Sequence, residues 1–143
     1  MTSGYSKTPL ARKLGIKPGS PVLVVNGPGD YLELLDPLPE GVVVTSAAPT
    51  RKQIGVGDTA PMAHMFTKSR DELESLLPAL MDAIPKNGMI WISWPKKASK
   101  VPTDVTEDVI REVALPLGLV DTKVCAVDDT WSGLRLVYRK ENR

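Results

Sequence analysis

The sequence is poor in the residues that most often build catalytic and metal sites. It has one cysteine, Cys125, and one histidine, His64, among 143 residues. A single cysteine cannot form a disulfide within the chain, and neither residue has a second thiolate or imidazole with which to hold zinc. Both lie in apolar segments, so we expect buried structural residues, and a serine or cysteine triad lacks a convincing base.

Long hydrophobic runs are absent as well. No apolar stretch approaches the roughly 20 residues that a helix needs to span a bilayer, and residues 1–7 lack the apolar core of a signal peptide. Repeats, low-complexity segments and a long polar linker are also missing. We therefore expect no membrane association, a cytoplasmic location and a single Rossmann-like domain over residues 1–143.

Neither sign of charge is in excess. The chain has 18 Lys and Arg against 17 Asp and Glu, a formal net charge of +1. This balance gives no overall electrostatic attraction to nucleic acid or to an anionic membrane, so the sequence does not favour a nucleic-acid partner. A basic site would have to be local.

Short apolar, β-branched runs alternate with helical patterns along the chain. Strands are predicted at 21–26, 41–45, 62–66, 89–94, 124–127 and 134–139, and helices at 9–14, 31–35, 70–84 and 104–113. Thr8 is expected to cap the first helix, Ser69 and Glu72 form a capping-box pattern, and residues 46–60 are predicted as a loop. The runs 21–26 and 41–45 are typical of strands buried on both faces.

This alternation predicts the fold class. Strands that alternate with helices imply right-handed crossovers and a mostly parallel sheet covered on both faces. The last two runs are joined by a short connection and predict an antiparallel hairpin. We therefore expect an α/β three-layer Rossmann-like sandwich, mostly parallel, with a C-terminal antiparallel hairpin.

A glycine-containing loop, Asn26-Gly-Pro-Gly-Asp30, follows the first predicted strand. In open parallel sheets, ligands bind outside the carboxyl ends of the strands. Backbone donors at Asn26, Gly27 and Gly29 would therefore face a ligand there. Asp30 opposes an anion, and it can instead cap the next helix or pair with a lysine.

The second candidate segment is Trp-Ile-Ser-Trp-Pro-Lys-Lys-Ala-Ser-Lys, residues 91–100. Side chains alternate along a strand, so Trp91 and Trp94 are expected to pack on opposite faces, and Pro95 to end the strand. Lys96, Lys97 and Ser99 then follow a strand predicted to neighbour the first. They would bind phosphate or carboxylate opposite the glycine loop, and an exposed Trp94 would extend that site. The alternative is a solvated loop beside a buried tryptophan.

The segment Asp128-Asp-Thr-Trp-Ser-Gly133 offers two adjacent carboxylates. Successive strand residues point to opposite faces, so the two acids would not converge on a metal without a turn. We expect turn chemistry here, with Trp131 packed over the end of the sheet and Arg135 paired with one of the acids.

Two resemblances follow from these segments. The element order resembles the core of the class I S-adenosylmethionine-dependent methyltransferases, with Val22–Asp30 as the first strand-turn-helix and Leu80–Ser93 as a later helix-turn-strand. The resemblance implies an acidic residue before a three-glycine loop and a carboxylate at the end of the second strand. Here the loop reads Asn26-Gly-Pro-Gly29, and the strand ends Thr45-Ser-Ala-Ala48.

A more specific similarity rests on the segments Gly4–Gly19 and Trp91–Leu136, with the motifs Trp-Pro-Lys-Lys-x-Ser and Thr-Trp-Ser-Gly-Leu-Arg. On these the chain is identified as a member of a bacterial family of unknown function, number 3052. The resemblance implies a short, stand-alone cytoplasmic protein and supplies no activity or catalytic residue.

Three functions remain open from the sequence. The first is a non-catalytic regulatory or interaction module with a degenerate cofactor loop. The second is a binder or enzyme for a phosphorylated or carboxylated metabolite, and the third is a divergent methyltransferase. The expected partner is an anionic small molecule or a protein, including a second copy that pairs with the edge of the C-terminal hairpin. No cofactor and no metal can be assigned from the sequence.

Overall fold

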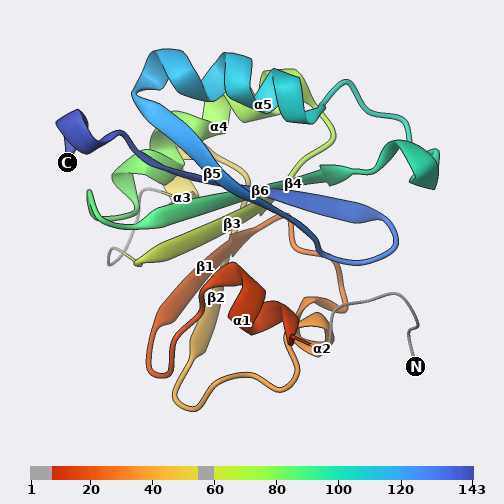
Figure 1. Cartoon of the computed structure of the whole chain (residues 1–143), viewed down its shortest axis with the longest axis vertical. Helices are drawn as coiled ribbons and strands as arrows, with labels where there is room; N and C mark the ends of the chain where they lie inside the picture. Colours follow the sequence, from red (N-terminus) through yellow and green to blue (C-terminus); the bar gives the residue numbers. More distant parts are fainter. Residues whose placement is uncertain (1–7, 55–59) are drawn as a thin grey trace.

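A six-stranded sheet forms the centre of the protein in the computed structural model, which describes residues 8–54 and 60–143. Its strand order is β2-β1-β3-β4-β6-β5 (Figure 1). The first four strands pair in parallel, and β6 is antiparallel to both of its neighbours. The strands are β1 (Pro21–Val25), β2 (Val43–Ala47), β3 (Met62–Phe66), β4 (Met89–Pro95), β5 (Leu119–Ala126) and β6 (Trp131–Tyr138).

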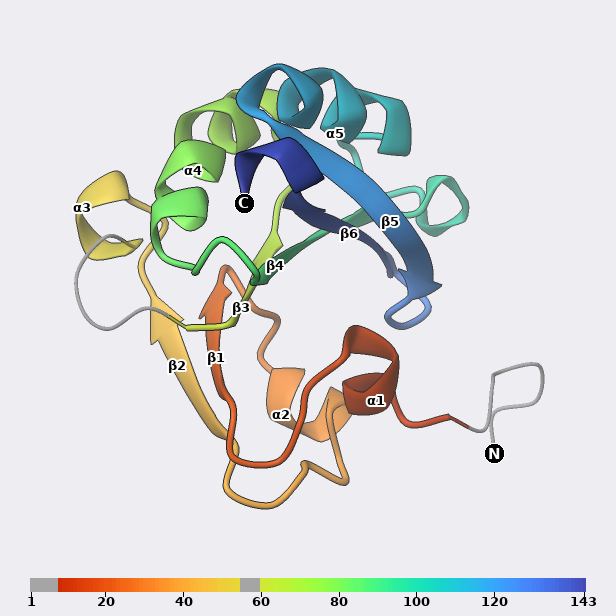
Figure 2. The same ribbon diagram turned by 60° about the vertical axis from the view of Figure 1, so that its left-hand side comes forward.

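Helices cover both faces of this sheet, as Figure 2 shows. One face is covered by α1 (Leu10–Leu14) and α2 (Tyr31–Leu34), and the other by α3 (Arg51–Ile54), α4 (Arg70–Asp82) and α5 (Glu107–Ala114). Each face buries its own apolar cluster against these helices. The expected three-layer α/β sandwich with a mostly parallel sheet and a C-terminal antiparallel hairpin is confirmed.

The two tryptophans of β4 lie on opposite faces, as expected. Trp91 is fully buried in the cluster under α1 and α2, and Trp94 lies in the cluster under α4 and α5. The indole nitrogen of Trp91 donates to the backbone carbonyl oxygen of Leu14 at 2.8 Å, which ties the C-terminal end of α1 to the sheet. A buried indole N–H needs such a partner.

His64 lies at the centre of β3 and is fully buried. Its Nδ1 is hydrogen-bonded to the Tyr31 hydroxyl at 2.9 Å, and its Nε2 to the Ser93 hydroxyl at 2.7 Å. Its ring stacks on Phe66 with centroids 4.3 Å apart. Burial disfavours the charged imidazolium and lowers the pKa of His64 to about 3, and burial also raises the pKa of Tyr31. The histidine is therefore a neutral part of the core, as expected from its apolar context.

Side-chain caps mark the start of the two longer helices. The Ser69 hydroxyl accepts from the Glu72 amide at 3.2 Å, and the Thr106 hydroxyl accepts from the Val109 amide at 3.2 Å. The capping box predicted at Ser69 is only half formed, because the Glu72 carboxylate accepts from the Thr67 hydroxyl instead.

Several boundaries differ from those predicted. Pro9, not Thr8, holds the N-cap position of α1. The second strand begins two residues later than expected and is not buried, because it forms an edge of the sheet. Part of the loop predicted at 46–60 is regular: β2 extends to Ala47 and α3 follows, whereas residues 55–59 lie outside the described part. Both hairpin strands begin earlier than expected and are longer, since the sheet supplies pairing that short apolar runs do not reveal.

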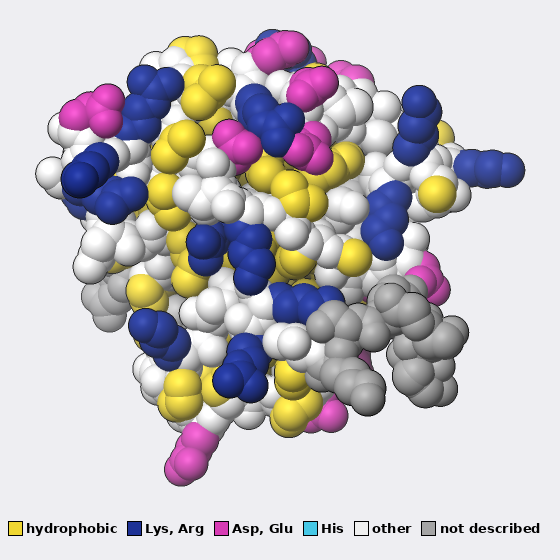
Figure 3. All heavy atoms as spheres, viewed as in Figure 1, with side chains coloured by type: hydrophobic (Ala, Val, Ile, Leu, Met, Phe, Trp, Pro, Cys, Tyr) yellow, Lys and Arg dark blue, Asp and Glu magenta, His cyan; other side chains and the backbone are white. Residues whose placement is uncertain are grey.

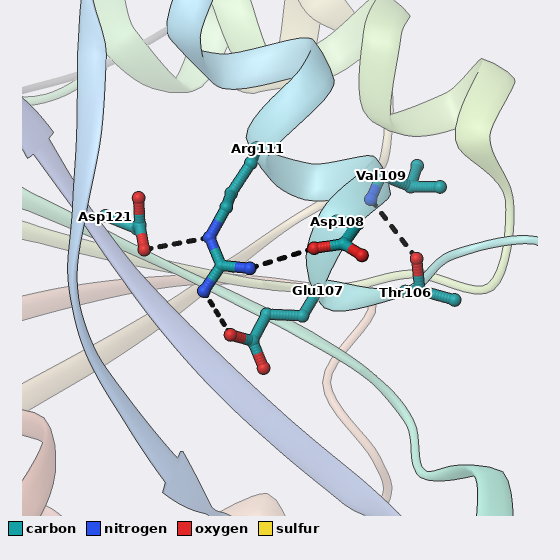
Figure 4. A network of polar contacts seen from close by, with 6 residues as sticks. All are labelled: Thr106, Glu107, Asp108, Val109, Arg111 and Asp121. Atoms are coloured by element: carbon teal, nitrogen blue, oxygen red, sulfur yellow. Dashed lines mark hydrogen bonds and ion pairs between the residues drawn. The ribbon is translucent and has the colours of Figure 1, made fainter.

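The hairpin contains an irregularity that changes which way its side chains point. The register between β5 and β6 shifts between Asp121 and Lys123. Asp121 therefore faces α5, where its carboxylate accepts from Arg111 Nε at 3.0 Å (Figure 4). Lys123 pairs with Arg135 on the opposite, α1-facing side. In a regular strand Lys123 would point to the same side as Asp121, and the bulge turns it to the opposite side.

Candidate functional site

The strand order reverses between β1 and β3, which makes the carboxyl ends of these strands the candidate site for a ligand. The chain leaves β1 for the edge strand β2 and returns to β3 on the other side of β1, so the order reverses between these two strands. Ligands of open α/β sheets bind outside the carboxyl ends of the strands at such a point. A groove of about 570 Å³ opens there. This strand-end groove is lined by Asn26, Gly27, Phe66, Thr67, Lys68, Ser69, Glu72 and Trp131.

The Glu72 carboxylate connects two other residues of the groove lining through hydrogen bonds. Its Oε1 accepts from the Thr67 hydroxyl at 2.7 Å and from Asn26 Nδ2 at 3.2 Å. Asn26 holds a left-handed backbone conformation, φ 60°, which turns the chain sharply after β1. The side chains that follow β1 and β3 are thus joined through one carboxylate on the first turn of α4.

Packing within the protein explains the first glycine of this loop but not the second. A Cβ at Gly27 would lie 2.9 Å from Val24 Cγ2, so glycine is needed for packing of the loop against β1. A Cβ at Gly29 would meet no atom within 4 Å, so no close approach requires glycine there. Asp30 stands at the N-cap position of α2, but its side chain makes no cap hydrogen bond.

The segment after β4 lies away from this loop. We expected β4 to neighbour β1, and that is wrong, because β3 lies between them. Trp94 is buried, with only 8% of its surface exposed. Ser99 donates to the Lys96 carbonyl oxygen at 2.6 Å within a 3₁₀ turn over Lys97–Ser99. The structure thus brings Asn26 and Gly27 into the strand-end groove, Gly29 into a smaller hollow beside β2, and none of Trp94, Lys96, Lys97 and Ser99 into either.

Sequence reasoning missed most of the groove lining. Thr67, Lys68 and Ser69 follow β3 directly, and the rule that ligands bind at strand carboxyl ends would have found them. Trp131 is the first residue of β6 and follows the hairpin turn, where Asp128 Oδ1 accepts from the amides of Thr130 and Trp131, each at 2.8 Å. The predicted turn chemistry is confirmed.

Trp131 packs edge-on against Phe66 with centroids 5.1 Å apart. It therefore covers the end of the sheet, as expected. Arg135 does not pair with the acids of the turn, because its Nε donates to the Thr122 hydroxyl at 2.8 Å. Its position in the middle of β6, opposite Trp91, carries it away from the turn.

Neither a metal-binding cluster nor a membrane-spanning helix occurs among the described residues. Within residues 8–54 and 60–143, no group of three or more His, Cys, Asp or Glu side chains could hold a metal ion. No helix in that same part of the chain is long and apolar enough to cross a membrane.

Comparisons with known proteins agree with the observed fold. A family model described as "Protein of unknown function (DUF3052)" matches residues 58–140. No curated protein sequence matches the chain. Among solved structures, a SAM-dependent methyltransferase from Aquifex aeolicus superposes with a TM-score of 0.68 at 17% identity, covering 89% of this chain and 86% of that one.

Two further structures show the same similarity. An S-adenosylmethionine-dependent methyltransferase from Clostridium acetobutylicum has a TM-score of 0.61 at 9% identity, over 90% of this chain and 87% of that one. Magnesium protoporphyrin IX methyltransferase from Synechocystis, with bound SAM, has a TM-score of 0.59 at 13% identity, over 85% and 71%. At these identities the likeness establishes the methyltransferase-like fold alone.

The residues at the strand ends do not fit S-adenosylmethionine in the way this fold leads one to expect. The carboxyl end of β2 is Thr45-Ser-Ala47, which offers no carboxylate for ribose hydroxyl groups. The acid that does line the groove, Glu72, is already bonded to Asn26 and Thr67. Gly27 serves packing within the loop, as described above. No step of methyl transfer is therefore derived from these residues.

Proposed function

Because a family model matches more than half of the chain, the protein belongs to the DUF3052 family, and we propose that it is a non-catalytic regulatory or interaction module built on a methyltransferase-like fold. The observation that carries the proposal is the Glu72 network. Polar groups that would face a cofactor at the ends of β1 and β3 are joined to one another, the Asn26 amide and the Thr67 hydroxyl both donating to the same carboxylate oxygen.

The charges at the groove support the same proposal. Lys68 and Glu72 both line it, so an anionic ligand would meet a carboxylate beside a single lysine. The lysines expected to bind phosphate, Lys96 and Lys97, are separated from the β1 loop by a whole strand. The metabolite-binding alternative required this pair of lysines to lie opposite the glycine loop, so this arrangement speaks against it.

A sheet edge is the surface on which such a module would receive a partner. β2 and β5 are the two edges of the sheet, and each has an exposed valine, Val43 at 63% and Val124 at 49%. A free edge offers backbone donors and acceptors to an added strand. The simplest partner is a second copy that pairs through β5. Sedimentation velocity should then show a dimer that Val124→Pro dissociates, whereas a monomer at all concentrations would leave a different protein as the partner.

Calorimetry with S-adenosylmethionine and S-adenosylhomocysteine at millimolar concentration tests the non-catalytic assignment. We expect no saturable binding and no methyl transfer. The alternative is a divergent methyltransferase, which the fold and the position of the strand-end groove favour. Saturable binding that Asn26→Ala abolishes and Lys97→Gln leaves intact would establish that alternative and overturn the proposal.

A thermal-shift screen against nucleotides and sugar phosphates tests the metabolite alternative separately. A ligand at a hundred times its Kd should stabilise the fold by about 2.7 kcal/mol, which is a shift of several degrees at this size. A shift that disappears in a Lys96→Ala, Lys97→Ala double variant would restore the lysine site. A shift that disappears only in Lys68→Ala would place the ligand in the strand-end groove.

A further inference from the structure

A second cavity lies at the opposite end of the sheet from the strand-end groove. Its volume is about 310 Å³, within the range of roughly 300–1,000 Å³ that small-molecule sites occupy. The first residues of three parallel strands, Pro21, Met62 and Met89, line it together with Lys17 and Arg135. We call it the amino-end pocket. It is separate from the site at the strand carboxyl ends and does not depend on the function proposed for that site.

The walls of the amino-end pocket are mainly apolar. Ile16, Val22, Met62, Met89 and Val137 all line it. Methionine side chains are unbranched and flexible, so they adapt to the shape of a ligand. A Cβ at Gly15, another lining residue, would lie 3.0 Å from the Met89 methyl carbon, which shows how closely the turn after α1 approaches this wall.

The charged residues of the pocket have one sign. Among its lining residues Lys17 and Arg135 are cationic and none is Asp or Glu. Arg135 Nε donates to the Thr122 hydroxyl at 2.8 Å, which fixes the direction of the guanidinium. Within residues 8–54 and 60–143, neither Lys17 nor Arg135 forms a salt bridge, and the terminal nitrogens of Arg135 have no protein acceptor.

The bulge in β5 adds to this positive charge. It turns Lys123 to the side of Arg135, so two cations stand opposite each other across the strand pair. Like charges in this arrangement are destabilising. Lys123 Nζ donates to the Lys13 carbonyl oxygen at the end of α1, at 3.3 Å. Lys123 therefore has a hydrogen-bond partner, whereas the terminal nitrogens of Arg135 have none among the described residues. Figure 3 shows Lys and Arg side chains over the middle of the face formed by α1 and the hairpin, with carboxylates mainly toward its edges.

We propose that the amino-end pocket binds a small apolar molecule that carries one carboxylate. The apolar part would lie against Met62 and Met89, and the carboxylate would accept hydrogen bonds from the terminal nitrogens of Arg135. A planar guanidinium matches the two oxygens of a carboxylate, and bonds between charged groups are the strongest hydrogen bonds in proteins. Lys17 adds a second, more exposed positive charge.

Calorimetry with octanoate, octanol and octylammonium tests the chemistry. These probes share one chain and differ in the head group. We expect saturable binding of octanoate, binding of octanol weaker by about tenfold or more, and no binding of octylammonium. Equal affinity for octanoate and octanol would overturn the assignment of Arg135, and tight binding of octylammonium would overturn the proposal as a whole.

Variants of the full chain locate the site. Arg135→Gln should weaken octanoate binding by about tenfold or more and Lys17→Gln by about two- to threefold, since an exposed ion pair contributes less. Ser20→Trp should block the pocket, because Ser20 lines it and is only partly buried. Arg139→Gln is the matched control outside the lining and should leave affinity unchanged. An equal loss in Arg139→Gln, or full affinity in Ser20→Trp, would contradict the proposal.

Methyl NMR keeps the test independent of the stability of any one variant. In the wild-type protein, octanoate should shift the methyl resonances of Met62 and Met89, which line the pocket, and leave that of Met81, which does not. Shifts that spare Met62 and Met89 would overturn the proposal even if calorimetry recorded heat.

Discussion

The two faces of the sheet handle polar groups in different ways. Under α4 and α5, charged side chains are paired at the surface: Arg70 bonds to Glu74 and Glu112, and Arg111 bonds to Glu107, Asp108 and Asp121. Under α1 and α2, a neutral polar group lies inside the core, and two cations line a cavity without a carboxylate. On the first face the ion pairs join α4 to α5 and α5 to β5. On the second face the two cations that line the cavity form no salt bridge within the described residues.

The largest expected effect is the loss of Trp91, which anchors α1 to its face. Trp91→Ala removes a fully buried indole and leaves the Leu14 carbonyl oxygen without its donor. We expect the free energy of unfolding to fall by about 4 kcal/mol, measured by urea denaturation. Val124→Ala, at an exposed position, is the control. A loss below about 1 kcal/mol in Trp91→Ala would show that this core does not depend on the indole.

The buried histidine should make stability depend on pH. Its pKa is about 3 in the folded chain, against about 6.5 when unfolded. Between these values the unfolded state binds the additional proton, so stability is complete above pH 6.5 and is lost as pH falls. The expected loss is about 1.4 kcal/mol for each pH unit below 6.5.

His64→Gln isolates this contribution, because the carboxylates titrate in both proteins. Urea denaturation at several pH values between 4 and 7 should give a shallower pH dependence for His64→Gln than for the wild type. Parallel curves would mean that the pKa of His64 is the same in the folded and unfolded states.

Removal of helix caps should have an effect of intermediate size on stability, and the effect should differ between the two faces. Ser69→Ala and Thr106→Ala each remove a hydroxyl that accepts from a helix amide, and each should cost about 1 kcal/mol of stability. Asp30→Ala, on the other face, should change stability little, because the Asp30 side chain makes no cap hydrogen bond. Thermal unfolding of the three variants checks the difference. An equal loss in all three would remove the distinction between the two sets of helices.

The smallest expected effect concerns Arg111. Its bonds to Asp121 and Glu107 raise its pKa, but the side chain is 34% exposed, so solvent screens the charges. Arg111→Gln should lower the melting temperature slightly at low salt and less at 1 M salt. A loss that does not change with salt would mean that packing of the side chain, not its charge, joins α5 to β5.

Local patterns predicted much of the fold. The β-branched run at β1, the alternation that sends Trp91 and Trp94 to opposite faces and the hydroxyl cap at Ser69 all depend on neighbours within a few residues. The candidate site was less predictable. Asn26 and Gly27 line the strand-end groove, but Trp131 and Glu72 reach it from distant parts of the chain. The residues next to Glu72 and Trp131 in the sequence do not indicate that these two side chains line the same groove.

The sequence by itself determined the α/β class, the mostly parallel sheet with its C-terminal hairpin and the tight turn at Asp128, because periodicity and turn chemistry are local properties. Only the tertiary structure decided which strands are neighbours. Insertion of β3 between β1 and β4 separates Lys97 from the glycine loop, leaves β2 at an edge and brings Thr67 to Asn26 through Glu72. The physical reason is that strand order depends on where each crossover returns to the sheet, and that choice is made by packing across the whole domain.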